Sequence, residues 1–256
     1  MSDLVSAEAR DRIGWIVMNR PPLNVVNAEM CRLMRLATEA FDADDVTNAI
    51  VITAAGEKAF GAGADVGEHT QEKIAQLSDE MFALFEVLRR PDGKPRIAVV
   101  KGICSGGGNE VAQACDFVIA RDDARFSQPE INIGAFGIVG CMMMTRDAPR
   151  GKMLELGLTG DWIGAEEARG LGIVAQVFAR DSFDETLNAY LDKYRSKSMA
   201  ALRIGRAAYL RNCEKPLDEA LPAVHDWVLN EAILIEDYEE GVHAFLEKRK
   251  PVWKNR

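Results

Sequence analysis

Short apolar runs alternate with helical patterns along the first 180 residues of the chain. The runs are mostly rich in valine and isoleucine, which favour buried strands. Between the second and third run, apolar residues recur every three or four positions from Ile74 to Leu88 and form one helix face, and a second helix fits Ala28–Phe41. This alternation predicts an α/β fold with buried strands. The expected strands are Ile13–Met18, Ala49–Thr53, Ile97–Val100, Asp116–Ala120 and Ile173–Val177.

The pattern changes after about Arg180, where strand signals vanish and helix formers dominate. Helical spacing links Leu187 to Tyr194, and a longer helical stretch runs from about Leu217 to Lys248. We therefore predict two parts. Residues 1–180 form an α/β core that carries the functional site, and residues 181–256 form a helical C-terminal subdomain.

Composition excludes several classes of function. The 256 residues include 40 acidic and 31 basic side chains, and the net charge of −9 argues against a nucleic-acid partner. No apolar run approaches ~18 residues, so we expect no membrane span. The five cysteines are scattered and never form a CxxC pair, which suggests reduced thiols and a cytoplasmic location. The three histidines lie far apart, so no metal site is expected, and carboxylate or backbone chemistry is the place to look.

Two segments rich in small residues follow strand candidates. The segment Gly102–Glu110 contains three consecutive glycines before a helical run, and the segment Ala59–Asp65 reads Ala-Phe-Gly-Ala-Gly-Ala-Asp. Each alone is best explained as a tight structural turn, because glycine permits unusual dihedrals and close backbone approach. Together, two such loops could direct two N–H donors at one oxygen, which is the arrangement of an oxyanion hole.

Two glutamates supply a candidate carboxylate pair. Glu110 ends the glycine-rich segment, and Glu130 stands in the run Phe126-Ser-Gln-Pro-Glu-Ile. An isolated glutamate in such a place is more often a surface or capping group. As a pair, carboxyl groups do acid–base work, because their environments separate their protonation states.

These motifs, in this order, resemble the enoyl-CoA hydratase/isomerase (crotonase) superfamily over the whole chain. Each motif alone is modest, but the order and spacing of all of them are specific. They are Asn19-Arg-Pro, Asn24, Ala59–Asp65, Gly106-Gly-Gly-Asn-Glu110, Cys115-Asp116, Gln128-Pro-Glu130-Ile, Leu158-Thr-Gly160, Ala165, Ala168, Gly172, Val174 and Ala244–Pro251.

The resemblance implies a crotonase-like spiral of β-β-α units followed by the helical subdomain. It implies that the backbone N–H groups of Ala62 and Gly107 bind the thioester oxygen, and that Glu110 and Glu130 are the two catalytic glutamates of the hydratase branch. It also implies a homotrimer or homohexamer, with CoA entering as part of the substrate and no separate cofactor. The residues expected to contact substrate or CoA are Val26, Ala62, Gly63, Ala64, Asp65, Gly107, Phe245 and Lys248.

The expected activity is hydration of an α,β-unsaturated acyl-CoA thioester. An isomerase or an acyl-CoA hydrolase of the same fold is the alternative, and a non-catalytic CoA-ester binder or RNA-associated scaffold is a further one. Many relatives with other chemistry lack one or both glutamates, so their joint presence here favours the hydratase and argues against the scaffold.

The chain departs from the family pattern at Gly137–Thr145, where an apolar cluster with Met142–Met144 replaces small and polar residues. This cluster is either core filling, which methionine does well, or the wall of an enlarged acyl pocket. Pro22–Met30, Asp65–His69 and Glu72–Leu77 are similar to the cyclohexa-1,5-diene-1-carbonyl-CoA hydratases, which hydrate a cyclic dienoyl-CoA. In that comparison His69 is either a pocket group or an exposed capping residue.

The last twelve residues, Phe245–Arg256, carry five basic side chains and one acid. This reversal of charge on an acidic protein has two explanations of about equal weight. It is either a solvated end whose cations suit a helix C-terminus, or part of the site for a polyanionic ligand such as CoA.

Overall fold

The computed structural model describes residues 3–256, and its centre is a pair of sheets. The larger sheet has six strands in the order β1-β2-β3-β5-β7-β10, all parallel except for the β1–β2 hairpin. The smaller sheet has the order β4-β6-β8-β9. The strands of the larger sheet are β1 (Val5–Arg10), β2 (Ile13–Met18), β3 (Ala49–Ala54), β5 (Arg96–Val100), β7 (Phe117–Arg121) and β10 (Gln176–Phe178); those of the smaller are β4 (Ala59–Ala62), β6 (Ile103–Ser105), β8 (Arg125–Ser127) and β9 (Ile163–Gly164).

The two sheets arise from one repeated unit. In each repeat, a strand of the larger sheet is followed by a short strand of the smaller sheet and then by a helix: β3–β4 before α2 (Ile74–Arg89), β5–β6 before α3 (Gly107–Gln113), and β7–β8 before α4 (Ile138–Met144). The predicted spiral of β-β-α units is therefore confirmed. The remaining elements of this region are α1 (Ala28–Ala43), η1 (Val66–Glu68), η2 (Pro129–Ile133), α5 (Arg150–Thr159), α6 (Ala165–Gly170) and η3 (Arg180–Ser182).

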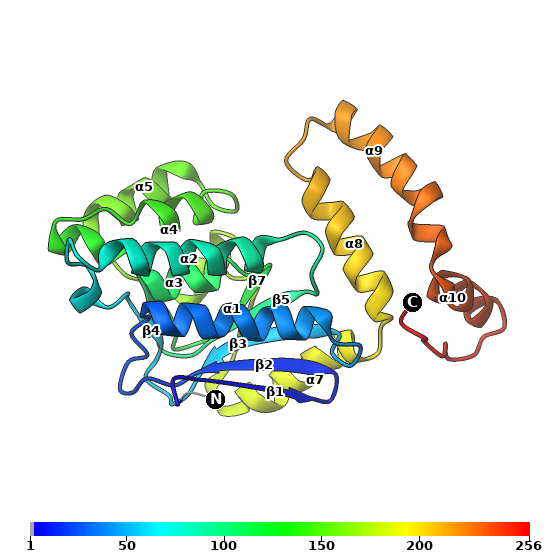
Figure 1. Ribbon diagram of the computed structural model, residues 1–256, viewed down its shortest axis with the longest axis horizontal. Coiled ribbons are helices and arrows are strands. Elements are labelled where there is room, and N and C mark those ends of the chain that lie inside the picture. The colour runs from blue at the N-terminus through cyan, green and yellow to red at the C-terminus, as the bar shows by residue number, and fades with distance from the viewer. Residues whose placement is uncertain (1–2) are drawn as a thin grey trace.

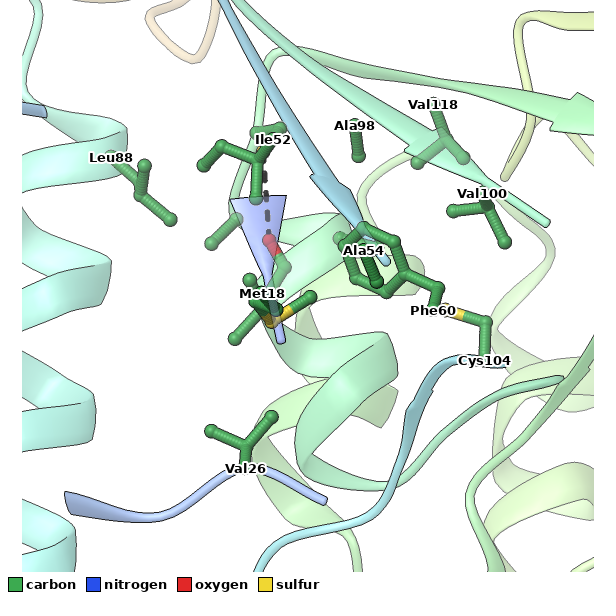
Figure 2. Close-up of a cluster of buried hydrophobic side chains, with 14 of the residues drawn as sticks. Met18, Val26, Ile52, Ala54, Phe60, Leu88, Ala98, Val100, Cys104 and Val118 are labelled. Carbon is green, nitrogen blue, oxygen red and sulfur yellow. Dashed lines mark hydrogen bonds between the residues drawn. The ribbon is translucent and has the colours of Figure 1, made fainter. Parts of the chain in front are cut away.

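Alternating side chains of the larger sheet serve two separate cores. In β3, Ile50 and Ile52 face the main core, while Ala49 and Val51 face the opposite side. Figure 2 shows the main core where Phe60 of β4 and Cys104 of β6 pack beside Val100, so the smaller sheet is anchored by apolar contacts with the larger one.

Four of the five predicted strands match observed ones to within one or two residues. The fifth is wrong at its start, because Ile173 and Val174 lie in a turn whose N–H groups donate to Ala168 O after α6, and β10 begins only at Gln176. The sequence analysis also missed β1. That strand is polar because it forms the exposed edge of the sheet and buries only Val5.

The C-terminal region begins with α7 (Phe183–Arg195), whose Phe183, Leu187 and Leu191 cover the second core. By this packing α7 is part of the α/β body, whereas α8 (Met199–Asn212), α9 (Leu217–Asn230) and α10 (Glu236–Leu246) extend away from it (Figure 1). The division at residue 180 stays a prediction. No helix among residues 3–256 has the length and apolar character needed to span a bilayer.

The single helical stretch predicted from Leu217 to Lys248 is wrong in one respect. The chain leaves helical geometry at Glu231, with φ −132° and ψ −56°, and a short turn, η4 (Ala232–Leu234), separates α9 from α10. The amphipathic spacing continues across this break, which is why periodicity alone did not reveal it.

One arginine fastens α8 to the body. The Nε and Nη2 groups of Arg206 each donate to the Asp116 carboxylate at 2.7 Å, and its Nη1 donates to the carbonyls of Arg90 and Pro91 at 2.7 and 2.9 Å. A bidentate pair of this kind fixes orientation as well as distance. The start of the C-terminal extension is therefore held rigidly against the sheet.

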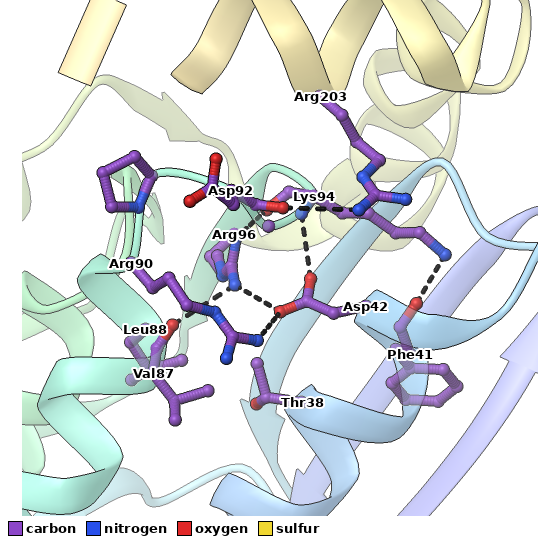
Figure 3. Close-up of polar contacts among 12 residues, drawn as sticks. Thr38, Phe41, Asp42, Val87, Leu88, Arg90, Asp92, Lys94, Arg96 and Arg203 are labelled. Atoms are coloured by element: carbon purple, nitrogen blue, oxygen red, sulfur yellow. Dashed lines mark hydrogen bonds and ion pairs between the residues drawn. The ribbon is translucent and has the colours of Figure 1, made fainter. Parts of the chain in front are cut away.

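Beneath this contact lies a buried ionic cluster (Figure 3). Asp42 at the end of α1 accepts from Arg96 Nη2 at 2.6 Å, from Arg90 Nη2 at 3.0 Å and from the Lys94 backbone at 2.9 Å. Arg96 is fully buried, and burial together with the nearby Arg206 charge lowers its pKa to about 10. The cluster thus ties α1 to the start of β5.

We expect the Asp42→Asn variant to lose about 3–5 kcal/mol in free energy of unfolding, because it leaves the buried Arg96 charge without its counter-ion. Urea unfolding measures this loss. As a control, Glu166→Gln removes the exposed pair with Arg169 and should cost less than about 1 kcal/mol. Equal losses in the two variants would contradict the account.

Candidate active site

Two glycine-containing segments cross in close contact at one end of the smaller sheet. A Cβ on Gly108 would overlap the Gly61 carbonyl, and a Cβ on Gly61 would lie 2.9 Å from the Gly108 Cα. Gly106, the residue before α3, has φ +49°, a conformation that side chains other than glycine rarely adopt. The strand β4 and the start of α3 can approach this closely only because these positions lack side chains.

The contact brings backbone N–H groups together, but not quite the pair that was predicted. The Ala62 N–H donates to the Leu23 carbonyl at 3.0 Å, so the prediction that it binds the thioester oxygen is wrong. The Ala64 N–H has no acceptor among residues 3–256, and neither has the N–H of Gly107 in the first turn of α3. A Cβ on Gly107 would lie 3.1 Å from the Ala64 nitrogen, so these two groups are neighbours.

The loop that carries Ala64 is held on both sides of that residue. The Val26 N–H donates to Gly63 O at 2.9 Å, and the Asp65 N–H donates to Val26 O at 2.8 Å. The Val26 side chain is fully buried in the core, so Val26 contributes to this loop through its backbone. The Ala64 N–H takes no part in this bridge to Val26.

Asp65 organises the entrance of this loop. Its carboxylate pairs with Arg20 at 2.6 Å and caps η1 by accepting from the Gly67 N–H at 2.8 Å, and both contacts lower its pKa. The exposed His69 follows η1, and its Nδ1 lies 2.8 Å from the Asp65 carbonyl oxygen. The contacts of His69 within the chain are therefore those of an exposed residue that caps a turn, which is the second of the two interpretations.

Glu110 lies in α3, three residues after Gly107, and is buried. Its Oε1 accepts from the Gly140 N–H in α4 at 3.2 Å. Burial, together with the charge of Glu130, raises the pKa of Glu110 to about 7. At neutral pH Glu110 is therefore partly protonated, which suits a group that gives and accepts protons in a reaction.

Glu130 lies in η2, which follows β8. Its Oε1 accepts from Gln128 Nε2 at 3.2 Å, and its Oε2 is buried without a partner among residues 3–256. Burial raises its pKa, which its own backbone N–H and the charge of His69 oppose. A Cβ on Gly106 would lie 2.9 Å from Oε1, so this oxygen faces the start of α3 and the neighbouring Gly107.

The predicted methionine cluster is divided between two environments. Met144 is buried in the main core, Met143 is half-buried against it, and Met142 is 64% exposed. Core filling thus describes Met144, and the three residues do not form one wall. Gly137 and Gly140 of the same segment lie against the glutamate region, where a Cβ on Gly137 would be 2.5 Å from Glu130 Oε2.

Phe245 and Lys248 lie far from this site within the chain. Figure 1 shows α10 on the opposite side of the molecule from α3 and β4, and Phe245 is 83% exposed. Three basic residues of the tail are paired with acids of α10 or its end: Arg249 with Glu240, and Lys254 and Arg256 with Glu236. Lys248 and Lys250 have no such partner within residues 3–256.

Reasoning from the sequence named the glutamates but missed the groups behind them. Fully buried Gln128 and Asn109 both stand inside motifs used for the family resemblance, and their polar character within a buried run was the available signal. Among residues 3–256, no group of three or more His, Cys, Asp or Glu side chains is arranged to hold a metal.

The chain belongs to the family described as enoyl-CoA hydratase/isomerase, which it matches over residues 8–256. It is 38% identical over 253 residues to a probable enoyl-CoA hydratase of Rhizobium meliloti, covering 97% of each chain, and 32% identical to a short-chain-enoyl-CoA hydratase of Clostridium acetobutylicum, covering 98% of each. The crystal structure of an enoyl-CoA hydratase from Mycobacterium smegmatis superposes with a TM-score of 0.91 at 28% identity, covering 98% of this chain and 99% of the other. The predicted superfamily is confirmed.

The raised pKa of Glu110 has a measurable effect on stability. Because the folded-state value of about 7 exceeds the ordinary 4.5, the folded chain holds this proton between those pH values, and stability falls as pH rises from 4.5 through about 7. We expect Glu110→Gln to match wild type at low pH and to be more stable by about 3 kcal/mol at pH above 8. Urea unfolding at both ends of this range measures it.

The exposed Glu86 in α2 provides the control for this experiment. Glu86→Gln should change the free energy of unfolding by the same small amount at both pH values. A Glu110→Gln variant whose stability relative to wild type does not depend on pH would contradict the buried, proton-holding glutamate.

Proposed function

We propose that this protein is an enoyl-CoA hydratase, a hydro-lyase that adds water across the double bond of an α,β-unsaturated acyl-CoA. The observation that carries the proposal is the meeting of buried Glu110 and half-buried Glu130 with two neighbouring unpaired N–H groups, those of Ala64 and Gly107. Hydration needs both features at once: donors for charge on the thioester oxygen, and groups that move protons. The enoyl-CoA hydratases among the relatives support the same activity.

The N–H groups of Ala64 and Gly107 receive the thioester oxygen. When water adds at the β-carbon, electrons move onto this oxygen and form an enolate. Preorganised donors stabilise that charge, and loss of one such donor elsewhere costs about 10²–10³ in rate. The donor pair is thus assigned to Ala64 and Gly107, in place of the predicted Ala62 and Gly107.

The two glutamates hold the attacking water between them. Burial raises the pKa of both glutamates, and Glu110 is the more deeply buried of the two, so we assign Glu130 as the member that loses its proton first. Glu130 accepts the proton of the water as its oxygen bonds to the β-carbon, and Glu110 orients that water. The carboxyl pair then delivers a proton to the α-carbon, so the net change is addition of H and OH. This sequence uses no metal and no redox cofactor, and CoA enters as part of the substrate.

The acyl group is a separate part of the proposal. The resemblance to the cyclohexa-1,5-diene-1-carbonyl-CoA hydratases supports a cyclic dienoyl-CoA as the substrate. An enlarged acyl pocket lined by Met142–Met144 would be a second argument for a cyclic substrate. Because Met144 is in the core and Met142 is exposed, that second argument falls. Straight-chain enoyl-CoAs should therefore be tested beside cyclic ones, with chromatographic identification of the products.

The assembly proposed from the resemblance is a homotrimer or a pair of trimers. Phe245 lies in α10 and Lys248 follows it, and α10 is on the opposite side of the molecule from α3 and β4, so a contact of either residue with CoA has to be made in a neighbouring subunit. The extension of α8–α10 carries many exposed apolar side chains, such as Leu217, Leu234 and Phe245, which a second copy would cover.

Glu130→Gln should lower kcat for hydration by about 10²–10⁴-fold, because it removes the group that takes the proton from water. Loss of the enoyl-thioester absorbance measures the rate, and calorimetry should show that CoA-ester binding survives. Glu185→Gln, an exposed change in α7, is the control. Full activity of Glu130→Gln would end the mechanism, and a product without oxygen from labelled solvent would identify an isomerase instead.

Lys248→Ala should raise KM for an enoyl-CoA about fivefold with little change in kcat, because an exposed ion pair with a CoA phosphate contributes about 1 kcal/mol. Lys254→Ala, whose ammonium is already paired with Glu236 at 3.0 Å, should leave KM unchanged. Light scattering of the same samples should give a multiple of three chains. A stable, fully active monomer would contradict the neighbouring-subunit contact.

A further inference from the structure

Behind Glu130 lies a pair of buried amides that the mechanism above does not use. Asn109 in α3 and Gln128 before η2 are both fully buried, so neither can touch the substrate. They are joined by a hydrogen bond of 2.8 Å from Asn109 Nδ2 to Gln128 Oε1. Burying an amide costs free energy unless its N–H and C=O groups make hydrogen bonds. A buried, hydrogen-bonded pair of amides next to a catalytic group therefore suggests a function for the pair.

The contacts of Asn109 fix which end of its amide faces Gln128. Its Oδ1 accepts from Gln113 Nε2 at 3.3 Å and lies 3.9 Å from the Cys104 thiol, a weak donor. Its Nδ2 lies 3.5 Å from the Met144 sulfur, a weak acceptor. The Met144 sulfur can accept but not donate, so this contact is the one that favours the NH₂ group of Asn109 on the side that faces the Gln128 oxygen.

Because Gln128 Oε1 accepts from Asn109, its Nε2 is the end that meets Glu130 Oε1, at 3.2 Å. A reversed Gln128 would place a carbonyl oxygen against a carboxylate and an NH₂ group against an NH₂ group. Gly140 leaves the space that this side chain occupies, since a Cβ there would overlap the Gln128 amide. A carboxylate oxygen accepts two hydrogen bonds, so Oε1 keeps a lone pair for the water.

Three ionisable groups face Glu130 from the surrounding elements. Glu110 of α3 holds its own proton to about pH 7, His69 after η1 lowers the pKa of Glu130, and the Cys141 thiol of α4 stays neutral because burial raises its pKa to about 11. Burial acts in the opposite direction to His69. The Gln128 Nε2 donates to Glu130 Oε1 at 3.2 Å, and a hydrogen bond donated to a carboxylate favours its ionised form.

We propose that Asn109 and Gln128 are positioning residues: Asn109 fixes the Gln128 amide so that an N–H group, and not a carbonyl, faces Glu130, which keeps this carboxylate ionised as the base of the reaction. The inference rests on the proposed hydratase function for the purpose of that base. The direction of the two hydrogen bonds, from Asn109 to Gln128 and from Gln128 to Glu130, does not depend on that function.

The test is a ¹³C NMR titration of the glutamate carboxyl groups in the full-length protein, with the Glu130 signal assigned by Glu130→Gln. Gln128→Met keeps the length of the side chain and removes its N–H, and should raise the pKa of Glu130 by about 1–2 units. Asn109→Leu keeps the branching at Cγ and frees the Gln128 amide to rotate, and should raise the pKa of Glu130 by roughly 0.5–1 unit. The acid limb of the kcat/KM profile should move to higher pH by the same amounts.

The double variant shows whether Asn109 changes the pKa of Glu130 through Gln128 or independently of it. If Asn109 acts through Gln128, then Asn109→Leu in the Gln128→Met background should shift the Glu130 titration by less than about 0.2 units. Should leucine not fit beside Met144, Asn109→Ser, which is too short to reach Gln128, replaces it in both backgrounds.

Asn48→Leu is the matched control, because Asn48 is also fully buried and donates to the Tyr194 and Lys197 carbonyls at 2.8 Å. It should lower the unfolding temperature and leave the Glu130 titration unchanged. An unshifted titration in Asn109→Leu, or an equal shift with and without Gln128, would overturn the positioning role. Wild-type protein that hydrates no enoyl-CoA would instead overturn the proposed function, so the two failures are distinct.

Discussion

The close approach of two backbone segments determines everything else at the site. Gly61 and Gly108 touch without intervening side chains, and this contact sets the distance between β4 and the first turn of α3. It makes the Ala64 and Gly107 N–H groups neighbours, and three residues further along α3 it fixes the position of Glu110. A single methyl group at this crossing would separate the donors, because protein interiors do not yield easily to added volume.

The second determinant is the shared burial of two carboxyl groups. In water both would be ionised at neutral pH, and neither could supply a proton. Burial raises the pKa of each, and the charge of Glu130 raises that of Glu110 further. The result is a pair in which one member acts as a base while the other still holds a proton, which is what water addition demands. The exposed His69 lowers the pKa of Glu130, and the buried Gln128 donates a hydrogen bond to its carboxylate.

Strong apolar periodicity made the large sheet and the helices α1 and α2 predictable, because their side chains enter a core with a regular repeat. The small sheet was not predictable in the same way, because β6 and β8 have three residues each, too few for a period to show. Glu110, Glu130 and Gly107 could be named from motifs. The exchange of Ala62 for Ala64 could not, since it depends on a hydrogen bond to Leu23, 39 positions earlier, that no local pattern reveals.

A crystal structure with a bound, unreactive 3-oxoacyl-CoA would test the central claim most directly. The account predicts the thioester oxygen within hydrogen-bond distance of both the Ala64 and Gly107 nitrogens, with Glu110 and Glu130 facing the β-carbon from one side and sharing a single water-sized space. A thioester oxygen bound anywhere else, or either carboxyl group turned away from the β-carbon, would contradict it.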